Sequence, residues 1–204
     1  MHRNNNERTT KEQRKNKERT KNMDINKSSN DEYRQFTSFA RIDGAIIGVM
    51  WVVSFFCFIG NLQMPVLGLA GMAIGIYSII LAAMRLRKFR DRILGGRISF
   101  GKATLYSIMT YFYATILMAV GQYVYFQFID QGYMVNQTIA MLSMPETAKA
   151  VTEVYGMDPK QMIAILQATM GTIRPIEIAF QFLTLNVILG IIISVPVGAL
   201  MRKQ

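Results

Sequence analysis

Four long apolar stretches, separated by polar segments, dominate the pattern of this chain. They cover about residues 40–60, 66–84, 103–128 and 178–201. An α-helix needs roughly 20 predominantly apolar residues to cross a bilayer, and each stretch is close to that length or longer. A soluble protein of 204 residues could not bury four such stretches. The pattern therefore predicts an all-α fold, a polytopic membrane protein with four transmembrane helices.

The connection between the third and fourth spans, residues 129–175, has helix signals of its own. Ser143 and Glu146 have the spacing of a capping box. Pro159 suits the first position of a second helix, and Gly171 suits its end. We therefore predict two short amphipathic helices here. They could lie on the membrane surface, cap the bundle or bind a partner, and we favour packing on the bundle.

The start of the chain differs in composition from everything after it. Residues 1–35 contain four hydrophobic side chains among Asn, Lys, Arg, Glu, Thr and Ser. Such a segment cannot bury enough apolar surface to offset its chain entropy, so it is expected to be a disordered basic tail. Residues 36–204 then form the transmembrane domain.

The distribution of Lys and Arg predicts the orientation. The chain is 51% hydrophobic, yet its net charge is +10. Of its 23 Lys and Arg residues, eleven lie in residues 1–43, seven in residues 85–102 and two at positions 202–203. Because cytoplasmic loops carry the excess of positive charge, both termini and the 85–102 connection are expected on the cytoplasmic side of the membrane. The basicity is thus an orientation signal, and we expect no nucleic-acid partner.

The residue inventory argues against most catalytic chemistry. Cys57 is the single cysteine and His2 the single histidine. Metal sites and histidine-based triads need several such groups to converge. We therefore expect no metal, no cofactor and no enzymatic activity.

Polar and small residues within the spans are candidates for internal contacts. Gln122, Gln181 and Asn186 could contact a polar ligand, or they could form hydrogen bonds between helices. Tyrosines near span ends, such as Tyr106, suit the aromatic belt of the membrane interface, whereas Tyr111 is deeper and is expected to pack against other helices. Small residues at four-residue spacing predict close helix packing, either within one chain or in a dimer: Gly44, Gly48, Gly71, Gly75, Gly190, Ser194 and Gly198.

The basic connection is the most distinctive part of the sequence. Its glycines, Gly95 and Gly96, match no nucleotide-binding motif. Asp91 could pair with a neighbouring arginine, and Asp43 is a further candidate to meet this patch. The seven cations are candidate contacts for anionic lipid headgroups: Arg85, Arg87, Lys88, Arg90, Arg92, Arg97 and Lys102.

The string FRDRILGGRISF at residues 89–100, followed by Gly101 and Lys102, resembles a signature of a bacterial membrane-protein family. That family is catalogued as domain of unknown function four-one-nine-nine. IDGAIIG from Ile42, FIDQGY from Phe128 and the basic end after the last span are similar to it as well. The resemblance covers about residues 36–204. It implies a four-helix inner-membrane protein, and it implies no activity, cofactor or catalytic residue.

These observations favour a non-enzymatic membrane protein that serves as an accessory or scaffold subunit of an envelope complex. Its expected partners are anionic lipid headgroups on the cytoplasmic side and either another membrane protein or a second copy of the chain. One alternative is binding or transport of a lipid or small molecule within the helix bundle. A membrane-embedded enzyme is the other alternative, but the carboxylates near the outer surface form no acid/base pair.

Overall fold

The computed structural model describes residues 33–169 and 172–203. The chain divides into two compact units, Met1–Phe39 and Ala40–Gln204. Most of the predicted tail, residues 1–35, therefore lies outside the described residues. All contacts discussed below belong to the second unit.

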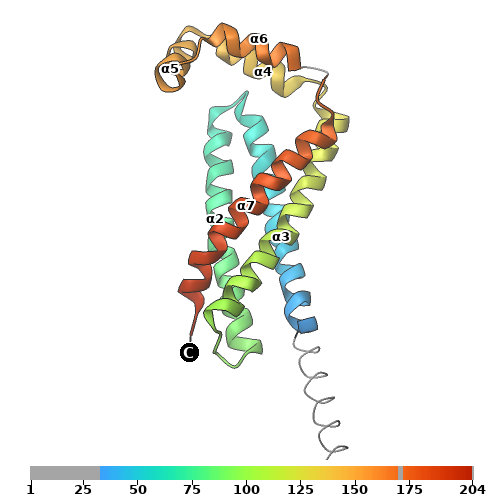
Figure 1. Ribbon diagram of the computed structural model, residues 1–204, viewed down its shortest axis with the longest axis vertical. Coiled ribbons are helices and arrows are strands. Elements are labelled where there is room, and N and C mark those ends of the chain that lie inside the picture. The colour runs from blue at the N-terminus through green and yellow to red at the C-terminus, as the bar shows by residue number, and fades with distance from the viewer. Residues whose placement is uncertain (1–32, 170–171, 204) are drawn as a thin grey trace, which may run out of the picture. The chain divides into compact units, whose positions relative to one another are not determined.

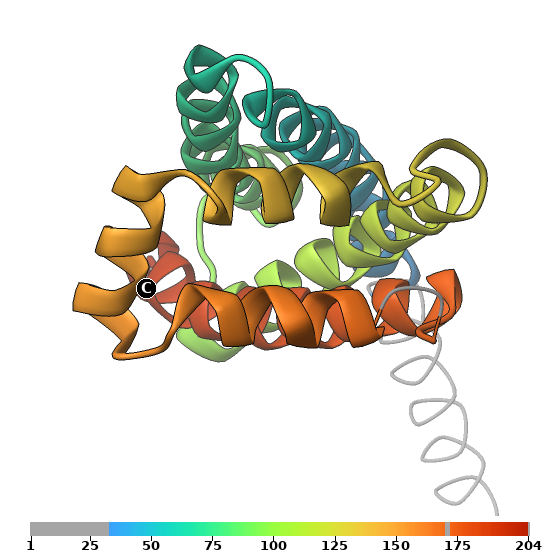
Figure 2. The same ribbon diagram turned by 90° about the horizontal axis from the view of Figure 1, so that it is seen from above.

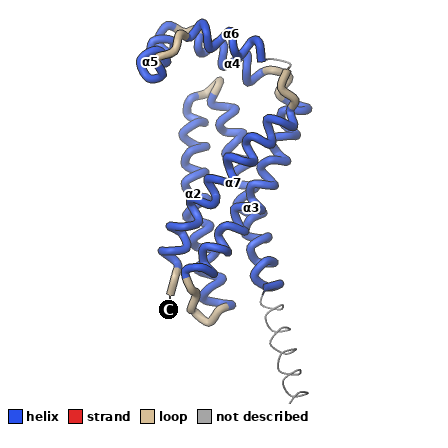
Figure 3. Tube along the Cα trace, viewed as in Figure 1, coloured by secondary structure: helices blue, strands red, loops and turns tan. Residues whose placement is uncertain are grey.

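The described residues form helices and no strand, so the predicted all-helical fold is confirmed (Figures 1 and 3). Among these residues, four helices are long and apolar enough to cross a membrane. The first is Tyr33–Asn61 and the second is α2, Pro65–Ile93. The third, α3 (Phe100–Val124), continues through the π-helical turn η1 (Tyr125–Ile129), and the fourth is α7 (Pro175–Met201).

Local sequence explains where these helices begin and end. Pro65 and Pro175 each occupy a first helical position, where a missing N–H costs nothing. The hydroxyl of Ser99 accepts a bond from the backbone of Lys102 and caps α3. Helix α2 extends beyond its apolar stretch to Ile93 and ends before Gly95, which adopts a φ of 64°. Glycine tolerates this left-handed conformation without steric cost.

Helix α3 is the centre of the bundle and packs most extensively against α7. The first helix contributes Ile47 to the core, where it meets Tyr111 and Ala114 of α3. The indole of Trp51 stacks on Tyr111, with ring centroids 5.9 Å apart, and donates to the hydroxyl of Ser78 at 2.9 Å. Stacking and one directed hydrogen bond thus join the first helix to α3 and α2. The expected packing of Tyr111 against neighbouring helices is what the structure shows.

Small residues occupy the closest contacts between these helices. A methyl group at Gly44 would lie 2.6 Å from the carbonyl oxygen of Thr110, and one at Gly190 would lie 2.9 Å from the Cβ of Tyr111. Of the remaining positions, Gly48 and Gly198 face α3, Gly71 faces the first helix, and Ser194 is fully buried. A methyl group at Gly75 would make only an ordinary contact, 3.9 Å from the Ser54 hydroxyl. At these close approaches, each glycine contacts another helix of the same chain.

The connection between the third and fourth spans differs from the prediction. Its described part contains three short helices rather than two: α4 (Tyr133–Leu142), α5 (Pro145–Tyr155) and α6 (Pro159–Thr169). Helices α5 and α6 match the two predicted segments. Helix α4 was missed because the residue before it is Gly132, at a φ of 83°, which has no side chain to cap the helix. The carboxylate of Asp130 accepts instead from the backbone of Met134 in the first turn, at 3.1 Å.

Two details of this insert also correct the sequence analysis. Ser143 ends α4 and donates its hydroxyl to the carbonyl of Ile139, so Met144 rather than Ser143 precedes α5. The favoured packing on the bundle was wrong for α5 and α6, since neither helix has a buried residue. The three helices contact one another instead, and Figure 2 shows them running in turn along three sides of an open rectangle.

Candidate functional site: a polar junction at the basic end

A buried carboxylate joins three helices at the end of the bundle that carries the 94–99 connection. Asp43 of the first helix is 3% exposed. Its Oδ1 accepts from the Nε of Arg85 in α2 at 2.6 Å, and its Oδ2 accepts from the hydroxyl of Tyr106 in α3 at 2.7 Å. A buried charge is tolerated only when it is paired and hydrogen-bonded, and both conditions hold here. We call these three residues the Asp43 cluster.

Apolar side chains shield Asp43 and Tyr106, which are buried, whereas the Arg85 side chain stays 28% exposed. Phe89 of α2 stacks on the Tyr106 ring, with centroids 4.6 Å apart and planes inclined by 22°. Leu86 follows Arg85 in α2, and Ala40 lies three residues before Asp43 in the first helix. Both are almost completely buried. Low water access strengthens the attraction between Asp43 and Arg85, and it also makes either group costly to leave alone.

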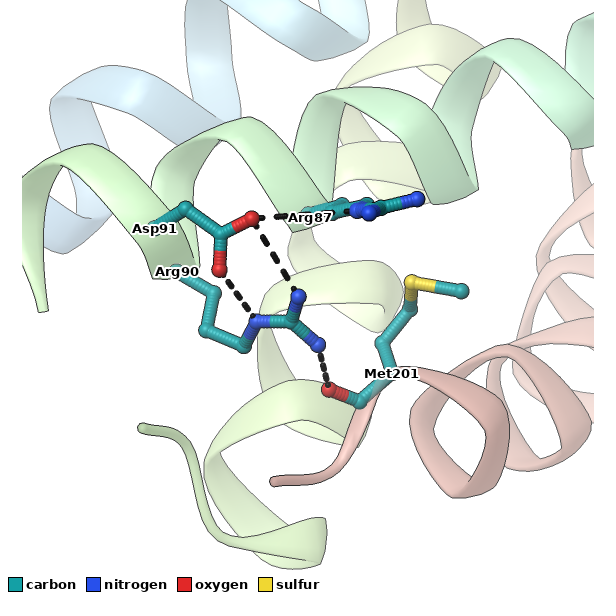
Figure 4. Close-up of polar contacts among 4 residues, drawn as sticks. All are labelled: Arg87, Arg90, Asp91 and Met201. Atoms are coloured by element: carbon teal, nitrogen blue, oxygen red, sulfur yellow. Dashed lines mark hydrogen bonds and ion pairs between the residues drawn. The ribbon is translucent and has the colours of Figure 1, made fainter. Parts of the chain in front are cut away.

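A second polar contact, the Arg90 clip, ties α2 to the end of α7 (Figure 4). Arg90 is 8% exposed, and its Nη1 donates to the carbonyl oxygen of Met201 at 2.9 Å. Its Nε donates to Oδ1 of Asp91 at 2.8 Å. The guanidinium therefore satisfies one of the carbonyls left without a partner at the end of a helix. The predicted pairing of Asp91 with a neighbouring arginine is found here.

The segment after α7 is held by main-chain bonds as well. Ile98 and Lys203 exchange both of their backbone hydrogen bonds, at 2.9 and 3.0 Å. The Ile98 side chain is buried. The 94–99 connection thus joins the ends of α2, α3 and α7.

The glycines of this connection serve the helix end rather than a ligand. The backbone amides of Leu94 and Gly96 both donate to the carbonyl of Arg90, at 3.2 and 3.0 Å. Gly96 also has a positive φ, 86°, which lets the chain turn back over the helix end. Two amides that a phosphate-binding loop would need are therefore already engaged.

The structure separates the seven candidate headgroup contacts into two groups. Arg85 and Arg90 are engaged inside the protein, in the Asp43 cluster and the Arg90 clip. The side chains of the other five are exposed: Arg87, Lys88, Arg92, Arg97 and Lys102. Arg87 also approaches Asp91 at 3.7 Å, a distance at which an exposed pair contributes little.

The three intramembrane polar candidates do not share one environment. Gln122 is 1% exposed, and its Oε1 has no hydrogen-bond partner among the described residues. Asn186 is partly buried, whereas Gln181 is exposed on α7. Gln122 and Gln181 thus differ in burial, although both belong to helices that pack against each other.

Tyr106 is the residue of this junction that the sequence analysis misjudged. It was expected in the interfacial aromatic belt, but it is 1% exposed and bonded to Asp43. Position alone suggested the belt, because Tyr106 lies near the start of a span. The available signal was Asp43, a charge at a span end that needs a donor from a neighbouring helix.

The chemistry of the junction is that of a structural contact. Both oxygens of Asp43 and the Nε of Arg85 are occupied by partners within the chain. In the described part of the chain, no three His, Cys, Asp or Glu side chains gather so that they could hold a metal ion. The arrangement neutralises charge and fixes the relative positions of the first helix, α2, α3 and α7.

Comparison with known families identifies the chain as a whole. Curated proteins and solved structures yield no match to it. A family model described as "Protein of unknown function (DUF4199)" matches residues 43–203. This range begins at the buried carboxylate and ends at the residue that pairs with Ile98, and it contains every contact of the polar junction described above. The chain therefore belongs to the DUF4199 family.

Proposed function

We propose that this protein is a non-enzymatic accessory or scaffold subunit of a membrane-protein complex in the bacterial inner membrane, and that a partner protein binds its insert. The exposure of the insert carries the proposal. Helices α5 and α6 have no buried residue, although each contains apolar side chains. Val154 and Tyr155 at the end of α5 are 73% and 71% exposed, and Ile165 of α6 is 60% exposed. Apolar surface of this kind on an ordered helix is typical of an interaction site.

The polar junction supports a scaffold role from the other end of the molecule. Its charged and hydroxyl groups hold helices together, which suits a rigid framework. A partner bound to the insert would then be held at a defined position, because short connections join the insert to both α3 and α7. Residues 130–132 separate η1 from α4, and residues 170–174 separate α6 from α7.

We further propose that both termini lie in the cytoplasm and the insert lies outside it. The exposed cations of the 85–102 connection support this orientation, as do Arg202 and Lys203. Reporter fusions after residues 63 and 150 test it. Both are expected to report from the outer side of the membrane, and a cytoplasmic signal from either position would contradict the orientation.

The partner is tested by site-specific photo-crosslinking in native membranes. A photoreactive amino acid at Tyr155 is expected to give a discrete adduct with another protein, because this side chain is apolar and exposed. The same amino acid at Glu153, two residues away and also exposed, is the matched control and is expected to give little adduct. Equal labelling at both positions, or a chain that always purifies alone, would contradict the proposal.

A second function, binding of a lipid or small molecule within the bundle, is favoured by one observation. The buried Oε1 of Gln122 has no hydrogen-bond partner among the described residues, and such an atom normally costs about 1–3 kcal/mol. A bound polar group would satisfy it. The exposure of Gln181 and the partial exposure of Asn186 argue against a site formed by all three.

A further inference from the structure

The outward face of α2 changes from apolar to basic within one helical turn. Tyr77, Ile80 and Met84 are exposed large side chains with the three- and four-residue spacing of a single helix face. Arg87 and Lys88 follow one turn later, three and four residues after Met84, and both are exposed. These five residues therefore form one continuous surface, which we call the α2 face.

The cations of the α2 face outnumber the acidic groups near them. Arg87 approaches Oδ2 of Asp91 at 3.7 Å. The buried Asp43 is neutralised by Arg85, and Asp91 is bonded most closely by Arg90. No described acidic residue forms an ion pair with Lys88. The α2 face therefore ends in excess positive charge, because Arg87 shares Asp91 with Arg90 and Lys88 has no acidic partner among the described residues.

The position of these cations along the helix matches the level of lipid headgroups. With a rise of about 1.5 Å per residue, Lys88 lies about 6 Å beyond Met84 along the axis of α2. The interfacial layer of a bilayer is of similar thickness, about 5–7 Å on each side of its hydrocarbon core. A lipid whose chains lie along Tyr77, Ile80 and Met84 would thus present its headgroup to Arg87 and Lys88.

We infer that the α2 face binds a phospholipid with an anionic headgroup. The exposed apolar side chains contact its acyl chains, and Arg87 and Lys88 contact its phosphate and headgroup charge. Arginine suits this role because its planar guanidinium can donate two parallel bonds to a phosphate, while lysine supplies a point charge. This lipid contact is separate from the protein partner proposed for the insert.

Thermal unfolding of the purified full chain in a neutral detergent tests the inference. Trp51 is the single tryptophan, and its stacking on Tyr111 makes its emission a report on the intact bundle. Phosphatidylglycerol is expected to raise Tm in a saturable manner, because a ligand that binds only the folded state stabilises it. Phosphatidylcholine is expected to leave Tm unchanged.

Charge-removing variants locate the site. Arg87→Gln/Lys88→Gln is expected to weaken the apparent affinity for phosphatidylglycerol about 30-fold, since each cation near an anionic surface contributes about fivefold. Lys149→Gln/Lys160→Gln removes the same charge from exposed positions in the insert and is expected to retain the affinity of the unaltered protein. Should the first pair unfold, Lys88→Gln alone is expected to give the fivefold loss.

Three outcomes would overturn the inference. One is an equal loss of affinity in the insert control, which would mean that only net charge matters. Another is an equal Tm increase with phosphatidylcholine, which would mean that detergent replacement alone stabilises the bundle. The third is the same Tm increase with soluble glycerol phosphate, which would indicate an anion site without a lipid. No partner protein is present, so the result is independent of the proposed scaffold function.

Discussion

Replacement of Asp43 by asparagine is expected to destabilise the protein by about 3 kcal/mol. The variant keeps the shape of the side chain but leaves Arg85 without its counter-charge in a mostly buried position. Breaking a buried ion pair typically costs 3–5 kcal/mol, and the partial exposure of Arg85 favours the lower end of that range. For a chain of this size the loss corresponds to a decrease in Tm of about 6–12 °C, measured from Trp51 emission in detergent.

Asp158→Asn is the matched control for this substitution. Asp158 is exposed, and its Oδ1 accepts from the backbone of Lys160, a role that asparagine fills equally well. Its Tm is expected to stay within about 1 °C of the unaltered protein, in keeping with the small effects of surface substitutions. If Asp43→Asn were equally neutral, the Asp43 cluster would not stabilise the bundle.

A double variant separates the charge effect from a general disturbance of the site. Arg85→Gln in the Asp43→Asn background removes the charge that the first substitution leaves unpaired. Part of the lost stability is therefore expected to return, because the cost came chiefly from an uncompensated buried charge. Additive losses in the double variant would show that Asp43 and Arg85 act independently.

Replacement of Gly198 by alanine is the second substitution with a large expected effect. The added methyl group would lie 2.9 Å from both the backbone nitrogen and the Cα of Thr104, and still closer to its hydroxyl. Backbone atoms of a packed helix cannot move away as a flexible side chain can. Helix α7 must therefore shift away from α3, and we expect a loss of about 2–3 kcal/mol, near the upper end of typical overpacking costs.

Gly75→Ala provides the control because it makes the same chemical change inside another long helix. The nearest atom to a methyl group at Gly75 is the Ser54 hydroxyl, 3.9 Å away, which is an ordinary contact. Alanine favours helix over glycine by up to about 1 kcal/mol, so this variant is expected to be neutral or stabilising. Thermal unfolding of the two variants should thus move Tm in opposite directions, and equal decreases would refute the close approach of α7 to α3.

The close packing of the spans could be predicted from sequence patterns only in part. Repeated small residues predicted close helix contacts, and Gly44, Gly190 and Gly198 do occupy them. The pattern could not tell contacts within one chain from contacts in a dimer, because both require the same small residues. It also included Gly75, where an added methyl group would make only an ordinary contact.

The basic connection also could be predicted only in part. Its seven cations predicted one electrostatic surface, yet Arg85 and Arg90 are internal. Helical spacing directs residues 86, 89 and 90 inward and residues 87 and 88 outward, as burial shows. That spacing applies only because α2 continues as a helix to Ile93, beyond its apolar stretch. The run of cations gave no sign in the sequence that the helix continues.

The insert could be predicted only in part. Proline at the first position of α5 and of α6 marks both helices locally. Helix α4 follows a glycine with a positive φ, and its first turn is capped by Asp130, which lies outside the usual N-cap position, so the familiar start signal is absent. Whether these helices are buried depends on how close they lie to the bundle. The spacing of apolar residues along a helix does not determine that distance.

By itself, the sequence determined that the chain is helical and that four of its helices suit a membrane. In lipid, a long run without charge can satisfy its backbone hydrogen bonds within itself only as a helix. This conclusion therefore does not depend on any tertiary contact. Only the tertiary structure decided that Asp43 meets Arg85 and Tyr106, and that Arg90 meets the end of α7. These partners lie 42, 63 and 111 residues apart, and such pairings depend on how the helices cross, which is set by side-chain packing across the whole bundle.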